Sequence, residues 1–289
     1  MPEFAALVLA WYEDAARDLP WRRPDAAPWA VLVSEIMLQQ TPVSRVLPAY
    51  AAWLERWPDP AALAGATAGD AVRMWGKLGY PRRALRLHAA ARELVERFGG
   101  TVPDDVDALL SLPGVGEYTA RAVAAFAFAQ RHPVVDTNVR RVVARAVLGR
   151  AEAGPPSTRR DLAAVESLLP DDPARAARFG VAVMELGALV CTARAPRCAD
   201  CPLARRCAWV LAGRPAHDGP AARTQRFSGT DRQVRGLLLD VLRAAPDPVP
   251  AAELDLAWAE PVQRQRALAG LLADGLVVAL PDGRYALPS

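Results

Sequence analysis

Apolar side chains recur every three or four positions over the first 210 residues, and Pro or Gly residues separate one such stretch from the next. This spacing places the apolar side chains on one face of an α-helix, so the pattern predicts a succession of helices with few strands. The clearest stretches are a face formed by Phe4, Leu7, Val8 and Trp11; a second helix with Val31, Ser34, Glu35 and Leu38 on one side; 72–75 behind a cap of Thr67 and Asp70; Arg82–Phe98, ended by Gly99 and Gly100; and Thr119–Ala129. A mainly α-helical fold is therefore expected.

The chain changes character between residues 208 and 228, where Gly, Pro, Ala and Arg replace the apolar periodicity. We expect a domain boundary near Gly213 and a linker over 214–228. Beyond it the pattern predicts a helix capped by Thr230 and Gln233 that runs to Arg243, helices over 251–258 and 261–273, and a hairpin of 276–280 and 284–287 around Pro281-Asp282-Gly283. Three helices closed by a hairpin predict a small winged-helix-like domain over 229–289, a type that binds nucleic acid or packs against protein.

The composition limits the class of protein. With 289 residues the chain has room for about two domains, and 52% hydrophobic with 23% charged residues is typical of a globular protein, which excludes wholesale disorder. No apolar run is long enough for a membrane helix and the N-terminus lacks the basic lead of a signal peptide, so we expect a cytoplasmic protein that does not bind membranes.

Basic residues are concentrated in two stretches. The net charge of +3 is small, but 73–97 and 131–160 each hold seven basic residues against two acidic ones, so two basic faces are expected if these helices are not simply solvated. Lys77 is the only lysine in the chain.

All four cysteines lie in one 17-residue span, 191–207, with the spacing C-x6-C-x2-C-x5-C. Disulfides are unexpected in a cytosolic chain, so the clustering predicts a site at which four thiolates bind metal. Tetrahedral zinc and a [4Fe-4S] cluster both accept four cysteines, and the spacing alone leaves both open.

A tight segment and two isolated carboxylates are the other candidates for chemistry. The glycines of Leu112-Pro113-Gly114-Val115-Gly116 allow a sharp turn that presents backbone N–H groups at the start of the next helix, a geometry that binds phosphate. Asp136 and Glu35 each lie in an apolar run, where a carboxylate is costly unless it is hydrogen-bonded or used in catalysis. Capping of a helix by Asp136 and a favourable helix-dipole position for Glu35 are the structural alternatives.

Taken together, these motifs resemble the helix-hairpin-helix DNA glycosylase superfamily and, within it, the MutY-type adenine DNA glycosylases. The segments that carry the resemblance run in order from about Asp18 to Cys207 and are Ser34–Thr41, Leu112–Gly116, Val135–Val142 and the cysteine spacing. The resemblance implies a helical fold of two lobes with DNA across the cleft, a glycosylase domain over 1–213 with a [4Fe-4S] cluster loop at 191–207, and removal of adenine mispaired with 8-oxoguanine or guanine in double-stranded DNA. We expect a monomer.

Functional residues follow from the same resemblance, position by position. Glu35 matches the catalytic acid and Asp136 the carboxylate opposite the sugar, while Tyr118 and Asn138 match polar groups near the reaction centre. Residues that match DNA- or base-contacting positions are Trp21, Arg22, Gln40, Thr41, Leu78, Tyr80, Gly114, Val115 and Gly116, and the cluster ligands are Cys191, Cys198, Cys201 and Cys207.

Three features define the expected activity more closely. Strand-cleaving relatives have a lysine where this chain has Tyr118, so a monofunctional glycosylase is expected. Val181 stands where many relatives have a Gln or Glu that contacts adenine, and the residues after Arg214 do not resemble the Nudix-like domain of longer relatives. We therefore expect weaker discrimination between 8-oxoguanine and guanine.

Two alternatives to the adenine glycosylase remain. One is a mismatch thymine glycosylase of the same superfamily, although Gln39-Gln40-Thr41 favours the adenine enzyme. The other is a non-catalytic iron-sulfur protein that binds DNA, although such a protein needs neither carboxylate beside a polyanion.

Overall fold

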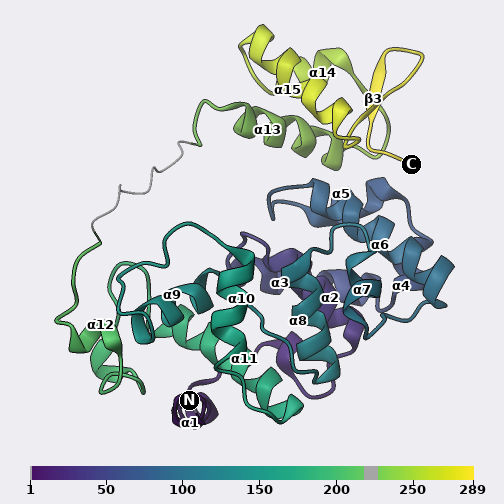
Figure 1. Cartoon of the computed structure of the whole chain (residues 1–289). Helices are drawn as coiled ribbons and strands as arrows, with labels where there is room; N and C mark the ends of the chain where they lie inside the picture. The colour runs from purple at the N-terminus through teal and green to yellow at the C-terminus, as the bar shows by residue number, and fades with distance from the viewer. Residues whose placement is uncertain (1, 218–226) are drawn as a thin grey trace. The chain divides into compact units, whose positions relative to one another are not determined.

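The computed structural model describes residues 2–217 and 227–289, and it is mainly α-helical, as the apolar spacing predicted (Figure 1). Residues 2–217 form α1 (Pro2–Ala15), α2 (Pro28–Leu38), α3 (Val43–Arg56), α4 (Pro60–Ala64), α5 (Ala68–Trp75), α6 (Arg82–Phe98), α7 (Val106–Leu110), α8 (Glu117–Phe128), α9 (Thr137–Ala146), α10 (Thr158–Glu166), α11 (Pro173–Leu189) and α12 (Ala208–Leu211), with short 3-10 turns at Pro20–Arg22 and Cys198–Asp200. Within the described residues no helix is both long and apolar enough to cross a membrane.

The chain divides into two compact units. The first contains Met1–Val31, Asp104–Leu110 and Val115–Ala221, and the second contains Leu32–Pro103, Ser111–Gly114 and Ala222–Ser289. The chain passes between the units inside α2 and again at the Gly114–Val115 step, so both units are discontinuous in sequence.

The core of the first unit forms around α11, which packs on α1, α8 and α9. Val8 of α1, Val139 of α9 and Phe179 of α11 are among its buried residues, and Phe4 meets Phe179 edge to face at 6.1 Å. Gly187 permits the close approach of α11 to α9, because a Cβ there would lie 2.7 Å from the Cβ of Asn138.

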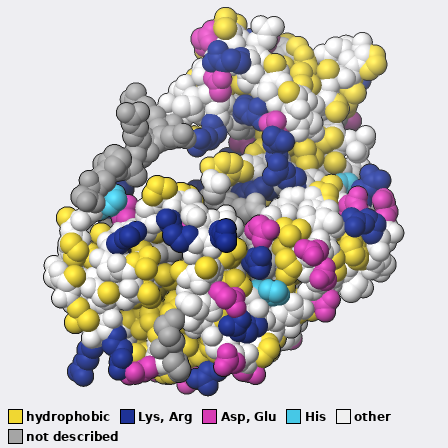
Figure 2. Space-filling model, viewed as in Figure 1, with side chains coloured by type: hydrophobic (Ala, Val, Ile, Leu, Met, Phe, Trp, Pro, Cys, Tyr) yellow, Lys and Arg dark blue, Asp and Glu magenta, His cyan; other side chains and the backbone are white. Residues whose placement is uncertain are grey.

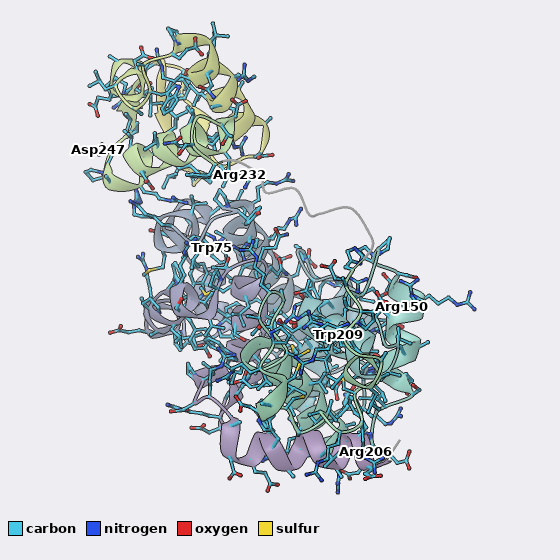
Figure 3. The ribbon with its side chains drawn as sticks, turned by 90° about the vertical axis from the view of Figure 1, so that its left-hand side faces the viewer. Trp75, Arg150, Arg206, Trp209, Arg232 and Asp247 are labelled. Carbon is cyan, nitrogen blue, oxygen red and sulfur yellow. The ribbon has the colours of Figure 1, made fainter. Side chains whose placement is uncertain are left out.

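The second unit has an aromatic core under α5 and α6. The Trp53 ring meets the Trp57 ring at 4.6 Å and the Trp75 ring at 5.6 Å, in both cases edge to face, and Trp75 lies among the helices in Figure 3. Thr67 and Asp70 form the predicted capping box at the start of α5, and α6 ends at Gly99 in the left-handed conformation, as predicted.

The C-terminal part of the second unit contains α13 (Asp231–Ala244), β1 (Val249–Pro250), α14 (Ala251–Asp255), α15 (Pro261–Ala273), β2 (Val278–Ala279) and β3 (Arg284–Ala286). The strands form an antiparallel sheet in the order β1-β3-β2, with Val249 opposite Tyr285 and Val278 opposite Ala286. We call residues 231–289 the C-terminal module. Figure 3 labels Arg232, in the first turn of α13, and Asp247, just beyond its end.

Three local expectations need correction or qualification. Thr230 is the N-cap residue of α13, but its side chain makes no capping bond and donates to the Phe227 carbonyl instead. Helix α2 has no single buried side, since residues 31–37 are all buried. The predicted linker over 214–228 falls mostly outside the described residues, and those of its residues that are described do not test it.

Candidate functional site

Glu35 lies in the last turns of α2, in the second unit. Glu35 is buried, and Val33 and Met37 of the same helix have no exposed surface. A carboxyl group in such surroundings is costly unless it is hydrogen-bonded or used in chemistry.

Two short segments of the second unit present exposed side chains on strained backbone. Gln40 has φ 57° in the turn after α2, and Tyr80 has φ 48° in the loop between α5 and α6. A non-glycine residue in this left-handed region costs of order 1–3 kcal/mol and is kept where the surroundings enforce it, often at functional sites. Both side chains are exposed, Tyr80 to 48%, so these two segments are candidates for contact with a ligand.

Arg83 fastens these two segments to each other. Its buried guanidinium donates to the carbonyl oxygens of Gln39 at 2.7 Å and Gly79 at 3.0 Å, and to Thr41 Oγ1 at 2.8 Å. It also donates to the last carbonyls of α2, those of Ile36 and Met37, at 2.9 Å each. Burial lowers the pKa of Arg83 to about 10, which still leaves the guanidinium charged at neutral pH.

Thr41 completes this connection. Its hydroxyl donates to the carbonyl of Leu78 at 3.2 Å, and both residues are buried. The structure therefore brings together four residues predicted to contact DNA: Gln40, Thr41, Leu78 and Tyr80.

Asp136, in the first unit, is the N-cap of α9 and is held on both carboxylate oxygens. Oδ1 accepts from the backbone N–H of Val139 at 2.7 Å, and Oδ2 accepts from the Asn138 side chain at 2.7 Å. Burial raises the pKa of Asp136 despite these hydrogen bonds. Asp136 therefore does cap α9, as the structural alternative predicted, and this capping holds its carboxylate in a fixed position.

Asn138 links Asp136 to the cysteine segment through Arg141. Arg141 donates to Asn138 Oδ1 at 2.7 Å and to the backbone carbonyl of Cys191 at 2.6 Å. It donates as well to the carbonyl of Gly187, at 2.7 Å. An unbroken chain of hydrogen bonds thus runs from Asp136 to the first cysteine.

The hairpin before α8 has the sharp turn that its glycines predicted. Gly114 has φ +82°, and a Cβ on it would lie 2.8 Å from the Cβ of Arg86. Gly116 is the N-cap of α8 and has no side chain to cap it, while Val115 is buried. The backbone N–H groups in the first turn of α8, directly after the hairpin, are therefore suited to bind an anion.

Trp21 and Arg22 lie on a 3-10 turn of the first unit beside a buried acid. Trp21 is buried, and Arg22 donates to Glu185 Oε2 at 2.9 Å. Glu185 also accepts from the side chain of Arg17 at 2.6 and 2.7 Å. Tyr118, on α8, directs its hydroxyl to the sulfur of Met184 at 3.6 Å.

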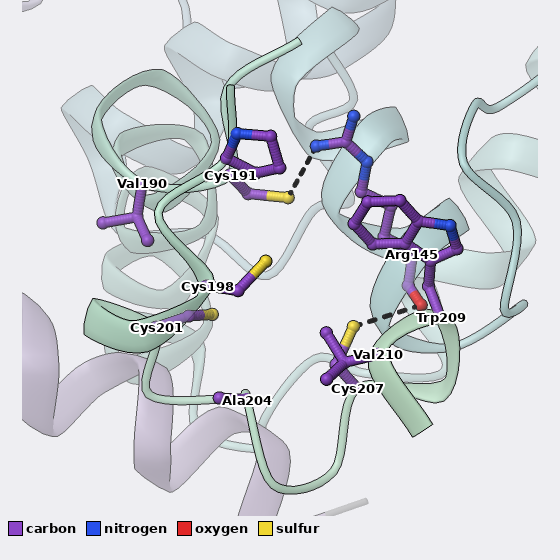
Figure 4. Close-up of a pocket in the computed structure, with 10 residues that line it drawn as sticks. Arg145, Val190, Cys191, Cys198, Cys201, Ala204, Cys207, Trp209 and Val210 are labelled. Atoms are coloured by element: carbon purple, nitrogen blue, oxygen red, sulfur yellow. Dashed lines mark hydrogen bonds between the residues drawn. The ribbon is translucent and has the colours of Figure 1, made fainter. Parts of the chain in front are cut away.

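The four cysteines line one pocket, together with Arg145 and Trp209 (Figure 4). Arg145 donates to Cys191 Sγ at 3.4 Å, and its guanidinium lies 4.9 Å from the centre of the Trp209 ring. Burial raises the pKa of the Cys201 thiol to about 11 and also raises that of Cys191. In the described part of the chain no three His, Cys, Asp or Glu side chains converge as they would around a single metal ion.

Several residues that shape these sites were missed or misread in the sequence. Arg83 and Arg145 belong to the two basic stretches, yet both are buried and bond mainly to backbone carbonyls, so these stretches are not uniformly basic faces. Figure 2 shows basic and acidic side chains interspersed on the face in view. Glu185 was detectable, because it is an acid within an apolar run, the same signal that drew attention to Glu35.

Comparison with known proteins agrees with the motifs. Residues 33–166 match the family described as "HhH-GPD superfamily base excision DNA repair protein". The chain is 61% identical over 282 residues to the adenine DNA glycosylase of Mycobacterium tuberculosis, covering 97% of this chain and 92% of that one. It is 58% identical over 281 residues to the adenine DNA glycosylase of Mycolicibacterium smegmatis, covering 97% and 94% of the two chains.

A solved structure supports the fold. A thermostable thymine-DNA glycosylase superposes with a TM-score of 0.66 at 27% identity, over 73% of this chain and 96% of that one. The predicted helical glycosylase fold and the predicted activity, adenine-specific cleavage of the N-glycosidic bond in DNA for base excision repair, are thereby confirmed. The chain belongs to the adenine DNA glycosylases of the helix-hairpin-helix base excision repair superfamily.

Proposed function

We propose that the substrate is adenine mispaired with 8-oxoguanine or with guanine in double-stranded DNA, and that Glu35 and Asp136 are the catalytic pair. Cleavage of an N-glycosidic bond needs a better leaving group and a stabilised sugar cation. Neutral Glu35 donates a proton to adenine N7, the C1′–N9 bond breaks with its electron pair leaving on the base, and ionised Asp136 stabilises the oxocarbenium-like sugar. Water then adds to C1′ and releases a proton.

The observation that carries this proposal is the way Asp136 is held. Two hydrogen bonds of 2.7 Å fix both of its oxygens, and Asn138, which supplies one of them, is fixed in turn by Arg141. A charge placed in advance stabilises a developing cation without reorganisation during the reaction. A residue that served only as a helix cap needs no such second support.

The adenine has to leave the base stack before it can react, which costs a few kcal/mol and less at a mispair. Gln40 and Tyr80 fill the gap and wedge between bases, and Thr41 and Leu78 hold the backbone of these two segments. Gly114, Val115 and Gly116 bind a phosphate through backbone N–H groups of the hairpin.

Base choice depends on Trp21 and Arg22, which contact the extruded adenine. The Val181 side chain has no group that could hydrogen-bond to the base, so the contact that a Gln or Glu makes with adenine in many relatives is absent. We infer that Gln40, Thr41 and Tyr80 read the opposite base, and that 8-oxoguanine and guanine are processed at similar rates.

The reaction stops at base removal. Strand scission by a Schiff base requires an amine nucleophile near the sugar, and Lys77 is the only lysine in the chain. Position 118 holds a tyrosine, which cannot form that adduct, and Tyr118 together with Asn138 supplies polar groups near the reaction centre instead.

The four cysteines fit a [4Fe-4S] cluster better than zinc. Four thiolates on one zinc ion converge at about 2.3 Å from the metal, whereas in a cluster each thiolate binds a different iron, which keeps the sulfurs apart. Cys191, Cys198, Cys201 and Cys207 line one pocket, and no such convergence occurs in the described part of the chain. When bound, the cluster would supply a redox-active centre and would tie the four cysteines of the 191–207 loop to one another.

Single-turnover cleavage of three duplexes tests the proposal. The purified chain is incubated with adenine opposite 8-oxoguanine, adenine opposite guanine and thymine opposite guanine, each with and without alkali. We expect cleavage at adenine only, visible only after alkali, at comparable rates for the two adenine duplexes. Cleavage at thymine would move the substrate to that of a mismatch thymine glycosylase, strand breaks without alkali would contradict the monofunctional assignment, and no cleavage on any duplex would indicate a non-catalytic DNA-binding protein.

A further inference from the structure

The C-terminal module contacts α5 within the second unit through reciprocal arginine bonds. Arg73 of α5 donates to the carbonyl oxygens of Arg243 at 3.1 Å and Ala245 at 2.8 Å. Arg243 donates in the opposite direction, to the carbonyl of Val72 at 3.0 Å. The Arg243 and Ala245 carbonyls belong to the C-terminal end of α13, where backbone acceptors lack helical partners and a positive charge is favourable.

A second contact joins the last residues of the chain to the first turn of α5. The backbone N–H of Gly69 donates to the Pro288 carbonyl at 2.6 Å. A Cβ at position 69 would lie 2.5 Å from that oxygen and 3.0 Å from the Cβ of Leu287. The tail therefore lies against α5 at a place that only glycine permits.

These contacts lie on both sides of the loop Gly76–Pro81 in the sequence. Val72 and Arg73 precede it, Lys77 within it lies 3.6 Å from Asp240, and Arg82 directly after it lies 3.3 Å from Asp274. The two ion pairs are exposed and add little stability by themselves, but they show that the module faces the loop from its start to its end.

The middle of the loop is held from the rest of the second unit. The Trp75 indole N–H and Arg83 each donate to the Gly79 carbonyl at 3.0 Å, and Thr41 donates to the carbonyl of buried Leu78 at 3.2 Å. These bonds fix two carbonyls of the loop, whereas the contacts with the C-terminal module lie at its flanks.

Gly76 and Gly79 have positive φ angles, which glycine adopts freely, but Tyr80 has φ 48°, a conformation that a side chain disfavours. A residue in this conformation persists only where the surrounding structure enforces it, and the flanks of the loop are part of those surroundings.

We propose that the C-terminal module, by docking on α5, holds the Gly76–Pro81 loop in the conformation that enters duplex DNA. The module is then a positioning element for substrate binding, and it acts without touching the reacting base. This inference rests on the proposed role of Tyr80 and its loop in DNA contact.

Gly69→Ala in the full-length chain is the sharpest test. Alanine favours a helix over glycine by about 1 kcal/mol, so a role confined to α5 predicts an unchanged or more stable protein. Displacement of the tail predicts faster amide hydrogen exchange in 76–80 and in 287–289, measured by mass spectrometry without DNA. If the competent loop population falls to between a tenth and a third, the duplex Kd rises about three- to tenfold, while the single-turnover rate at saturating enzyme stays within about twofold.

Two further variants make the result decisive. Gly65→Ala is the matched control, because its Cβ would meet nothing closer than 3.5 Å, and it should behave as wild type. Arg73→Gln weakens the same contact from the α5 side, because it removes the bonds to the Arg243 and Ala245 carbonyls. It serves as the test if Gly69→Ala leaves the tail in place. The proposal is overturned if exchange in 76–80 is unchanged in both variants, if it rises equally in Gly65→Ala, or if the tail loosens while duplex affinity stays the same. Because exchange is measured without substrate, a wild-type chain that cleaves no duplex would refute the proposed substrate and leave the docking result to stand on its own.

Discussion

Arg17 and Glu185 form a bidentate ion pair, with Nε and a terminal nitrogen of Arg17 at 2.6 and 2.7 Å from the two oxygens of Glu185. The Glu185 side chain is fully buried, and Arg22 adds a third side-chain bond at 2.9 Å. One carboxylate in the middle of α11 thus fixes both ends of the 17–22 segment, on which the proposed base-pocket residue Trp21 lies.

Removal of this carboxylate should be strongly destabilising. Glu185→Ala leaves Arg17 and Arg22 without their partner, and breaking a buried pair from one side typically costs about 3–5 kcal/mol. Because Arg17 is partly exposed, we expect a loss of about 3 kcal/mol in the free energy of unfolding, measured by urea titration. Glu166→Ala is the control, because it breaks an ion pair between Arg131 and a more exposed acid, and it should cost about 1 kcal/mol or less. Equal losses in the two variants would show that the buried pair contributes no more to stability than the exposed one.

The same residue predicts an acid dependence of stability. Burial alone would raise the pKa of Glu185, but the hydrogen bond from Arg17 and the charges of Arg22 and Arg17 outweigh burial and lower the pKa overall. The unfolded chain, with an ordinary Glu pKa of about 4.3, therefore takes up this proton first as the pH falls. The stabilisation is complete above that value and is lost as the pH falls through the lower folded pKa. Glu185→Gln should flatten this part of the stability curve below about pH 4.3, and a curve parallel to that of the wild type would contradict the assignment.

Arg83 should matter for both stability and DNA binding. Arg83→Gln removes most of the bonds that hold the Gln40 turn to the Gly79 loop, and each lost bond from a buried charged group is worth about 1.5–3 kcal/mol before the structure relaxes. We expect a lower Tm together with a duplex Kd raised at least tenfold. Arg92→Gln, at an exposed arginine of the same helix, should change neither quantity, and a fall in Tm without any effect on Kd would confine Arg83 to a structural role.

Asp136→Asn separates capping from catalysis. Asparagine caps helices about as well as aspartate, so Tm should change by little, whereas loss of the fixed negative charge should lower the single-turnover rate about 100-fold or more. Asp136→Ala should add a loss of about 1 kcal/mol in stability to the same rate defect. A rate for Asp136→Asn close to that of the wild type would leave Asp136 as a cap only.

The sequence predicted most helices, because apolar spacing and the residues at helix ends are local signals. It located α6 to the residue, the capping box of Thr67 and Asp70, and the role of Asp136 at the start of α9. It missed Arg83 because three of the carbonyls that this guanidinium binds, those of Ile36, Met37 and Gln39, lie more than forty residues earlier in the chain. No local pattern distinguishes a buried arginine from a solvated one. The contact of the C-terminal tail with Gly69 was unpredictable for the same reason, since it joins residues 219 positions apart.

The role of Glu35 as the catalytic acid is tested by the single-turnover rate of Glu35→Gln on a duplex with adenine opposite 8-oxoguanine, measured together with the affinity of the variant for that duplex. Glutamine keeps the shape and hydrogen-bonding capacity of the side chain but has no proton to give to N7. If Glu35 is the acid, cleavage falls by about 100- to 10,000-fold while the duplex Kd stays near that of the wild type. Cleavage at the wild-type rate with unchanged binding would show that Glu35 is not the acid and that the proton comes from elsewhere.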